Sequence, residues 1–204
     1  RVPVRLADLP PHVWRAVLAA EDARFYRHSG VDFIGIVRAA WVDLRERRAA
    51  QGASTITQQL AKNFFLSPER TVRRKVQEVF LAWLLEARMS KDRILEWYLN
   101  DVYLGSHGAA NVIGIGEAAR VFFDRDATAL TVGEAATIAG IIRAPNHNSP
   151  LRNPARARAR RDTVLDRMAE NRFITAREAA EAKAEPLRVR TGSTPGVEGL
   201  FFLQ

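Results

Sequence analysis

Apolar residues recur every three to four positions along most of this 204-residue chain, the period at which side chains share one face of an α-helix. Strict alternation, the pattern of a half-buried strand, appears only at Leu187–Val189 and near Leu200–Phe202. The pattern therefore predicts a mainly α fold. Helices are expected at 12–27, 54–66, 71–89, 91–104, 111–123, 131–143, 154–171 and 175–184, and a further apolar run occupies 31–44.

The starts of several helices carry capping signals. Thr55–Gln58, Thr131–Glu134 and Thr175–Glu178 each have the spacing of a capping box, in which two side chains satisfy the first free backbone N–H groups. Asn153-Pro154 supplies an N-cap residue followed by proline at the first helical position. These signals place the beginnings of helices more firmly than their ends.

Two polar segments lack the helical period. Residues 45–52 are expected to form a mobile loop. Residues 191–199 are rich in Gly, Ser, Thr and Pro, the composition of a linker. We therefore expect one domain over 1–190 and a linker over 191–204 that leads toward a further C-terminal domain.

Composition narrows the classes of protein. The absence of Cys excludes a disulfide scaffold, a thiolate zinc site and a cysteine nucleophile. The longest apolar run, Val79–Leu85, is far shorter than the roughly 20 residues that span a bilayer, so no membrane helix is predicted. The net charge of +8 favours phosphorylated substrates, anionic lipid or nucleic acid, unless it reflects only a compositional bias toward Arg. Because the aromatic residues follow core periodicity, nucleic acid is not expected.

Glu21 is the first candidate for chemistry. At about 100° per residue it shares the apolar face of its helix with Trp14, Leu18 and Phe25. A carboxylate on such a face is either desolvated, with a raised pKa, or paired with a cation. The alternative is a Glu that reaches solvent or forms a salt bridge to Arg15 or Arg24.

The helix that follows Ser54 is the second candidate. Thr55, Gln58, Gln59 and Lys62 share one polar face, and the helix N-terminus adds free N–H groups and a partial positive charge that would attract an anion. The alternative is a solvated helix face.

The helix at 71–89 carries basic residues at its N-terminal end, followed by Glu78 and then the longest apolar run. Cations at this end oppose the helix dipole, a cost that a bound anion would offset. Because the helix is apolar on nearly all sides, it is expected to lie in the centre of the domain.

Five blocks of the sequence, in order, resemble those of the family 51 glycosyltransferases, the peptidoglycan polymerases of class A penicillin-binding proteins and monofunctional transglycosylases. The first three resemble the motifs EDxxFxxHxG at 21–30, GxSTxTQQ at 52–59 and RKxxE at 74–78. The fourth lies at 91–105 and the fifth runs from Arg143 to Pro154.

The resemblance implies a mainly α, lysozyme-like, two-lobed helical domain with a membrane-facing hydrophobic lobe. It implies an enzyme that joins the disaccharides of lipid II into β-1,4 glycan strands by inverting transfer, with release of undecaprenyl pyrophosphate. Glu21 would be the general base that inversion requires. Glu78 would be the second catalytic residue, holding the cations in register or binding a divalent cation. The substrate-binding residues implied are Ser54, Thr55, Gln59, Lys62, Arg70, Arg74, Lys75 and Arg160.

The resemblance also implies the surroundings of the enzyme. No tightly bound cofactor is expected, apart from Mg²⁺ or Mn²⁺ at Glu78. The partners are lipid II, the growing glycan strand and the outer leaflet of the cytoplasmic membrane, which residues 31–44 and 64–66 should contact. The protein would work on the external, periplasmic face, with its anchor outside this segment and a transpeptidase domain fused to it.

Two other classes of function remain open at this stage. A lysozyme-like glycan hydrolase shares the helical architecture centred on a Glu, but it has no need of a cation cluster for an uncharged leaving group. A basic binding module would explain the net charge but not a Glu on the buried side of a helix.

Overall fold

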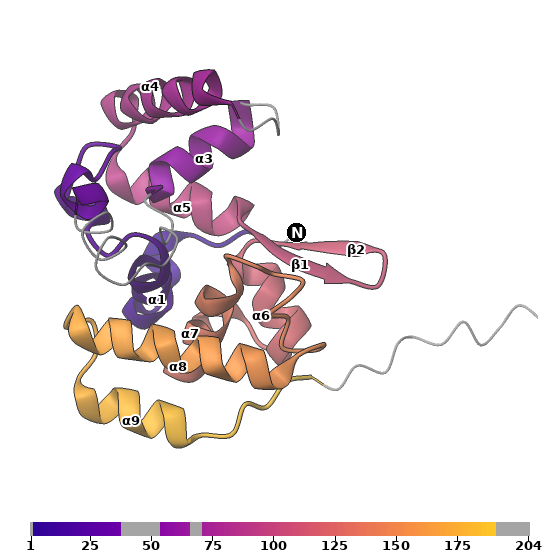
Figure 1. Ribbon diagram of the computed structural model, residues 1–204. Coiled ribbons are helices and arrows are strands. Elements are labelled where there is room, and N and C mark those ends of the chain that lie inside the picture. Colours follow the sequence, from indigo (N-terminus) through magenta and orange to yellow (C-terminus); the bar gives the residue numbers. More distant parts are fainter. Residues whose placement is uncertain (1, 38–53, 66–70, 191–204) are drawn as a thin grey trace, which may run out of the picture.

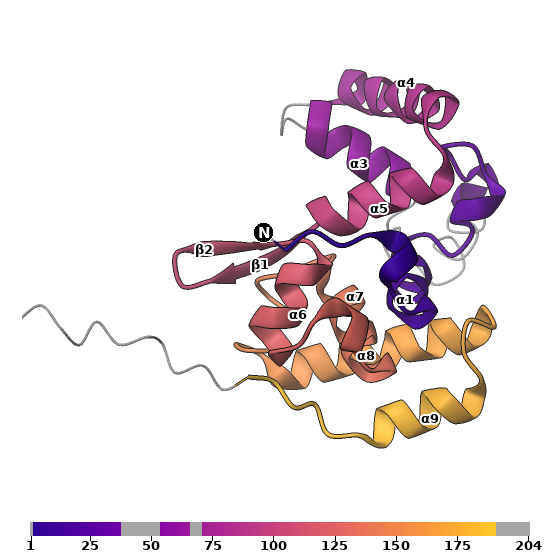
Figure 2. The ribbon, with the colours of Figure 1, turned by 180° about the vertical axis from the view of Figure 1, so that it is seen from behind.

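The computed structural model describes residues 2–37, 54–65 and 71–190, and this part of the chain is mainly helical, as the sequence predicts (Figure 1). The helices form two lobes with α1 (Pro11–Glu21) between them, an arrangement visible from both sides (Figures 1 and 2). The upper lobe contains α3 (Ile56–Phe65), α4 (Val72–Arg88) and α5 (Lys91–Asp101), and the lower lobe contains α6 (Ile115–Phe123), α7 (Val132–Ile141), α8 (Pro154–Glu170) and α9 (Ala176–Ala184). Short 3-10 turns lie at Leu6–Asp8, Phe25–Arg27 and Ala127–Ala129.

The central helix is α7, which packs against α1 and α8 and buries every residue from Ala135 to Ile141. The prediction that the helix at 71–89 is central is wrong. In α4 only Glu78 and Ala82 are buried, because the helix packs on one side against α3 and no other described helix covers its outer side (Figure 1). An apolar sequence predicted a core helix here, and the structure leaves much of its apolar surface exposed.

The first helix ends six residues earlier than its apolar period predicts, at Glu21 instead of Arg27. Asp22 leaves the helical conformation with φ −158°, and its carboxylate accepts a hydrogen bond from the backbone N–H of Ile56. Phe25 and His28 therefore do not continue the face of α1 that carries Glu21. A contact between segments far apart in the sequence ends the helix.

A β-hairpin replaces the start of the helix predicted at 111–123. Strand β1 (Tyr103–His107) pairs antiparallel with β2 (Ala110–Ile113), and the hairpin projects from the body of the molecule (Figures 1 and 2). Gly105 and Gly108 adopt positive φ angles within it, which glycine reaches without steric cost. The weak strand signal at Leu187–Val189 was wrong, since this segment forms no strand.

The three capping-box signals are confirmed, whereas Asn153 stands at the N-cap of α8 before Pro154 but its side chain makes no capping hydrogen bond. The side chains of Thr131 and Thr175 close capping boxes with Glu134 and Glu178. Thr55 exchanges hydrogen bonds with Gln58 at the start of α3. Because these signals depend on residues three apart, tertiary packing does not override them.

Several predicted segments fall outside the described residues: the loop at 45–52, the linker at 191–204, the strand near Leu200–Phe202 and the second half of the apolar run at 31–44. Within the described part of that run, residues 33–37 are helical. None of the described helices is long and apolar enough to cross a bilayer.

Gly114 provides a test of this packing. Its φ is +82°, and a Cβ there would lie 2.8 Å from the backbone oxygen of Asn100. Gly114→Ala should therefore lower the free energy of unfolding by more than about 2 kcal/mol, the sum of backbone strain and a clash with a rigid group. Urea denaturation measures the change.

Gly108→Ala is the matched control. Gly108 also has a positive φ, of +60°, but no atom lies within 4 Å of the added Cβ. It should cost only the backbone term of about 1 kcal/mol. Equal losses in the two variants would contradict the close approach at Gly114.

Candidate active site

Glu21 is the last residue of α1, and both lobes contact its carboxylate. From the upper lobe, Gln59 Nε2 donates a hydrogen bond of 2.9 Å to Oε2. From the lower lobe, Arg143 Nε lies 3.6 Å from Oε1, and the Glu21 side chain is only 7% exposed. Oε1 is buried and has no hydrogen-bond partner. One oxygen of the carboxylate is thus held in place while the other is available to accept a proton.

Burial raises the pKa of Glu21, because the charged form loses its hydration. The hydrogen bond from Gln59 and the positive charges of Arg143, Arg160 and Arg167 act in the opposite direction without cancelling this effect. The sequence predicted that Glu21 is either desolvated or paired with a cation, and the structure shows both. The partner is Arg143, whereas Arg24 pairs with Asp32.

Gln59 is oriented by Tyr98, a residue that the sequence analysis placed only within the fourth block. The buried Tyr98 hydroxyl donates a hydrogen bond of 2.9 Å to Gln59 Oε1. Because the amide oxygen is occupied in this way, the amide nitrogen must face Glu21. Burial and the charges of Glu21 and Asp22 raise the pKa of Tyr98, so its hydroxyl remains a donor.

Asp22 joins the first two sequence blocks. Its carboxylate accepts from the N–H of Ile56 at 3.1 Å and lies 2.9 Å from His28 Nε2. Thr55 Oγ1 donates to the carbonyl of Gly30 at 2.5 Å. The anion predicted at the N-terminus of α3 is therefore supplied by the protein itself, since Asp22 occupies that position.

The polar face predicted for α3 is mostly not solvated. Thr55 and Gln58 are each 2% exposed, Gln59 is partly buried and contacts Glu21, and Lys62 is exposed. In this structure the Thr55 hydroxyl is used within the protein. Of the residues predicted to bind substrate from this helix, Lys62 has the most accessible side chain.

A second charged cluster is formed by α4 and Ser54, which lies two residues before α3. Lys75 Nζ donates to Glu78 Oε1 at 2.6 Å and to Ser54 Oγ at 2.9 Å, and Arg74 lies 3.8 Å from Glu78 Oε2. Glu78 is 3% exposed. This arrangement supports the predicted role of Glu78 in holding the cations in register.

A divalent cation at Glu78 would need further oxygen ligands. Among the described residues, no group of three or more His, Asp or Glu side chains is arranged to hold a metal ion. Both oxygens of Glu78 face cations instead. The side chains around Glu78 therefore do not form a metal site by themselves.

Arg160 is not beside Glu78 but in the group of arginines around Glu21. Its Nε donates to the carbonyl of Gly140 at 3.2 Å, and its charge is coupled to those of Glu21, Arg143 and Arg167. Arg167 donates to the carbonyl of Ala20, the residue before Glu21. Arg70, also predicted to bind substrate, lies outside the described residues.

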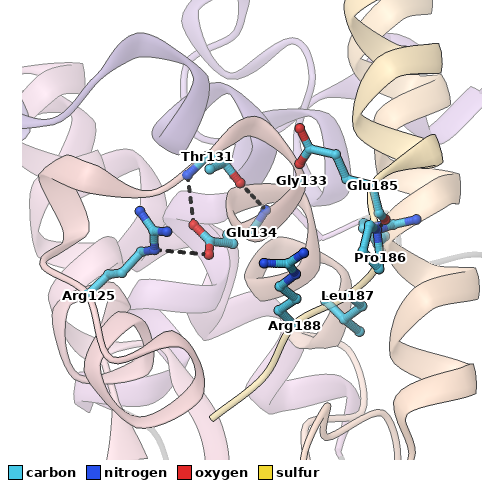
Figure 3. Close-up of a pocket in the computed structure, with 9 residues that line it drawn as sticks. Arg125, Thr131, Gly133, Glu134, Glu185, Pro186, Leu187 and Arg188 are labelled. Carbon is cyan, nitrogen blue, oxygen red and sulfur yellow. Dashed lines mark hydrogen bonds and ion pairs between the residues drawn. The ribbon is translucent and has the colours of Figure 1, made fainter.

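A cavity of about 260 Å³ lies at the other end of α7, between Thr131, Gly133 and the segment 185–188 (Figure 3). Glu134 in its wall is already paired with Arg125 at 3.3 Å and with the N–H of Thr131 (Figure 3). Arg143 follows the opposite end of this helix, roughly 15 Å away at 1.5 Å per residue. This cavity is separate from the Glu21 site.

The chain is similar to known proteins along most of its length. A family model described as Transglycosylase matches residues 1–169. Penicillin-binding protein 1A of Escherichia coli strain K12 is 50% identical over 187 residues, which are 92% of this chain and 22% of that protein. Penicillin-binding protein 1B of Vibrio cholerae is 44% identical over an alignment of 205 positions, which covers 100% of this chain and 26% of that protein.

A crystal structure of penicillin-binding protein 1A from Haemophilus influenzae has a related fold, with a TM-score of 0.53 and 24% identity over 93% of this chain and 18% of the other. The chain spans about a fifth to a quarter of the length of these relatives.

The desolvation of Glu21 predicts how stability responds to pH. A carboxyl group with a raised pKa in the folded state contributes stability at low pH that is lost as the pH rises through that folded-state pKa. Glu21→Gln should therefore be more stable than the wild type at neutral pH, and the difference should shrink toward acidic pH. Urea unfolding measured from pH 4 to pH 8 tests this.

Glu178→Gln is the control, because hydrogen bonds from Thr175 lower the pKa of Glu178. Its carboxylate contributes stability that is present at neutral pH and lost on acidification, so this variant should be less stable than the wild type at neutral pH. A wild type more stable than Glu21→Gln at neutral pH would refute the desolvation of Glu21.

Proposed function

This chain belongs to the transglycosylase family, and from that premise we propose that it polymerises lipid II into β-1,4 glycan strands as a peptidoglycan glycosyltransferase. The observation that carries the proposal is the buried carboxylate of Glu21, with one oxygen fixed by Gln59 and the other free of hydrogen bonds. A general base needs this combination of a raised pKa and an oxygen that is not already engaged in a hydrogen bond.

In the proposed reaction Glu21 Oε1 takes the proton of the acceptor 4-hydroxyl as that oxygen attacks the anomeric carbon of the donor sugar. The bond from this carbon to the pyrophosphate oxygen breaks on the opposite face, so configuration inverts in a single displacement. The electron pair leaves with the undecaprenyl pyrophosphate. No covalent sugar intermediate forms.

The leaving pyrophosphate needs charge stabilisation more than a proton, because it is a weak base. Lys75 and Arg74, held by Glu78, and the exposed Lys62 support a pyrophosphate site between α3 and α4. Arg70 belongs to the same proposal by its place in the sequence. A divalent cation bridging Glu78 and the pyrophosphate stays a prediction, and no step here depends on it.

The rival hydrolase would protonate an uncharged leaving group and would have no use for these cations. The family match also favours transfer over hydrolysis. A simple basic binding module would account for the net charge but gives no reason for a buried carboxylate with a raised pKa where the two lobes meet.

The upper lobe and the helical residues 33–37 together support a membrane-facing surface. Large apolar side chains are exposed at Phe33, Ile34, Val37, Phe64, Phe65, Val72, Val76, Phe80, Trp83 and Trp97. Phe65, Val76 and Phe80 also line an open apolar cavity of about 550 Å³. A polyprenyl chain leaves the bilayer only at a large transfer cost, so an enzyme acting on it benefits from a surface that enters the leaflet.

We therefore propose that the protein works at the outer leaflet of the cytoplasmic membrane, on its periplasmic face. The relatives that match are penicillin-binding proteins several times longer than this chain. A transpeptidase domain and a membrane anchor in the full-length protein follow as proposals from that similarity.

Glu21→Gln should bind lipid II but polymerise it about 10²–10⁴-fold more slowly, since only the proton acceptor is removed. Gel separation of labelled glycan strands measures the rate. Because the Gln variant keeps the shape of the side chain, near wild-type turnover would exclude Glu21 as the base. Release of fragments from preformed glycan would instead indicate a hydrolase.

Phe33→Ser combined with Phe80→Ser should weaken association with liposomes by at least tenfold, because two exposed apolar side chains are lost from the proposed membrane surface. Vesicle flotation measures this association. Tyr103→Ser is the control, since Tyr103 is exposed on the hairpin, outside this surface. Equal binding by all three proteins would place the membrane contact elsewhere.

A further inference from the structure

Three arginines approach Glu21 from the lower lobe. Arg143 follows α7 and lies 3.6 Å from the Glu21 carboxylate. Arg160 and Arg167, both on α8, are anchored on the carbonyls of Gly140 and Ala20. These two carbonyls belong to the ends of α7 and α1 that carry the site. We call these three residues the arginine cluster.

Two members of the arginine cluster, Arg143 and Arg160, share one carboxylate. Among the described residues, Glu21 is the carboxylate that lies 3.6 Å from Arg143, and its charge also acts on Arg160. Desolvation and mutual repulsion both act against the charged forms of Arg160 and Arg167. The Arg143 side chain is 29% exposed, so a ligand can reach the cluster. This arrangement favours an anion bound beside the base.

The position of the arginine cluster in the lower lobe indicates which kind of anion it would bind. The three helices of the upper lobe, α3, α4 and α5, expose large apolar side chains. The four described helices of the lower lobe, α6 to α9, expose none. If the upper lobe meets the membrane, the lipid pyrophosphates lie at that level, where Lys75 and Arg74 are found. The arginine cluster lies across Glu21 from them, on the side toward which a glycan strand would extend.

A peptidoglycan strand bears anions of one other kind, the carboxylates of its stem peptides. Guanidinium groups bind carboxylates through paired hydrogen bonds and remain charged at every physiological pH. We propose that Arg143 and Arg160 bind a stem-peptide carboxylate of the glycan substrate, so that the enzyme recognises the peptide as well as the sugars. This inference rests on the proposed polymerase function and names a further feature of its substrate.

The test compares two lipid-linked substrates that differ only in their stem peptides, one with free carboxylates and one with the same groups amidated. The full chain should polymerise the amidated substrate with a kcat/KM about tenfold lower, a difference of about 1.4 kcal/mol. Arg160→Gln should reduce kcat/KM more for the carboxylate substrate than for the amidated one, so that the preference disappears, whereas any effect of Arg160 on Glu21 lowers both rates alike. Arg160→Lys, which keeps the charge, should retain part of it.

Arg158→Gln is the matched control, because Arg158 is exposed on the same helix and its loss removes the same charge. It should keep the full preference. An equal rate of the wild type on the two substrates would overturn the proposal without the use of any variant. An equal loss on both substrates in Arg160→Gln would also overturn it, since Arg160 would then act only on Glu21 or on a pyrophosphate.

The same experiment separates this inference from the proposed function. If the wild type forms polymer from both substrates at equal rates, the proposed polymerase function is retained and the proposed binding of a stem-peptide carboxylate is rejected. The absence of polymer from both substrates, with the wild type, would overturn the function and the inference together.

Discussion

The structure depends on keeping one carboxylate, that of Glu21, largely out of water. Burial disfavours the charge, and the negative end of the α1 dipole, where Glu21 lies, disfavours it further. Gln59 from one lobe and Arg143 from the other hold the group in place. Because these partners come from different lobes, the packing of the lobes on α1 decides whether the site exists. The balance leaves the pKa raised, as a base near neutral pH requires.

The contacts behind these partners explain why the sequence blocks occur together. Asp22 ends α1 and starts α3 through the N–H of Ile56, which brings Gln59 to Glu21. Tyr98 then fixes which end of the Gln59 amide faces the carboxylate. The first, second and fourth blocks thus form one hydrogen-bonded unit. Loss of any one of these contacts would free the Glu21 carboxylate to change its orientation. In the proposed reaction, Glu21 is the residue of this unit that takes a proton from the substrate.

Charge and apolar surface are divided between the lobes. The upper lobe combines exposed apolar side chains with the cations around Glu78, which suits a lipid-linked pyrophosphate at a membrane surface. The lower lobe has the arginine cluster and presents no exposed large apolar residue on its described helices. Glu21 lies between the two. Such a division would orient a substrate whose tail is apolar, whose middle is anionic and whose far end is a peptide-bearing sugar.

The sequence by itself determined the helices, because their period and their caps depend on residues within one or two turns of each other. It also placed Glu21 in an environment that the structure confirms. Only the tertiary structure decided where α1 ends, since Asp22 bonds to Ile56 from 34 residues away. The exposure of α4 was likewise invisible to periodicity, which reports how apolar a helix is but not whether a neighbour covers it. Periodicity also could not predict that Tyr98 contacts Gln59 or that Arg143 contacts Glu21, because partners far apart in the sequence leave no local pattern.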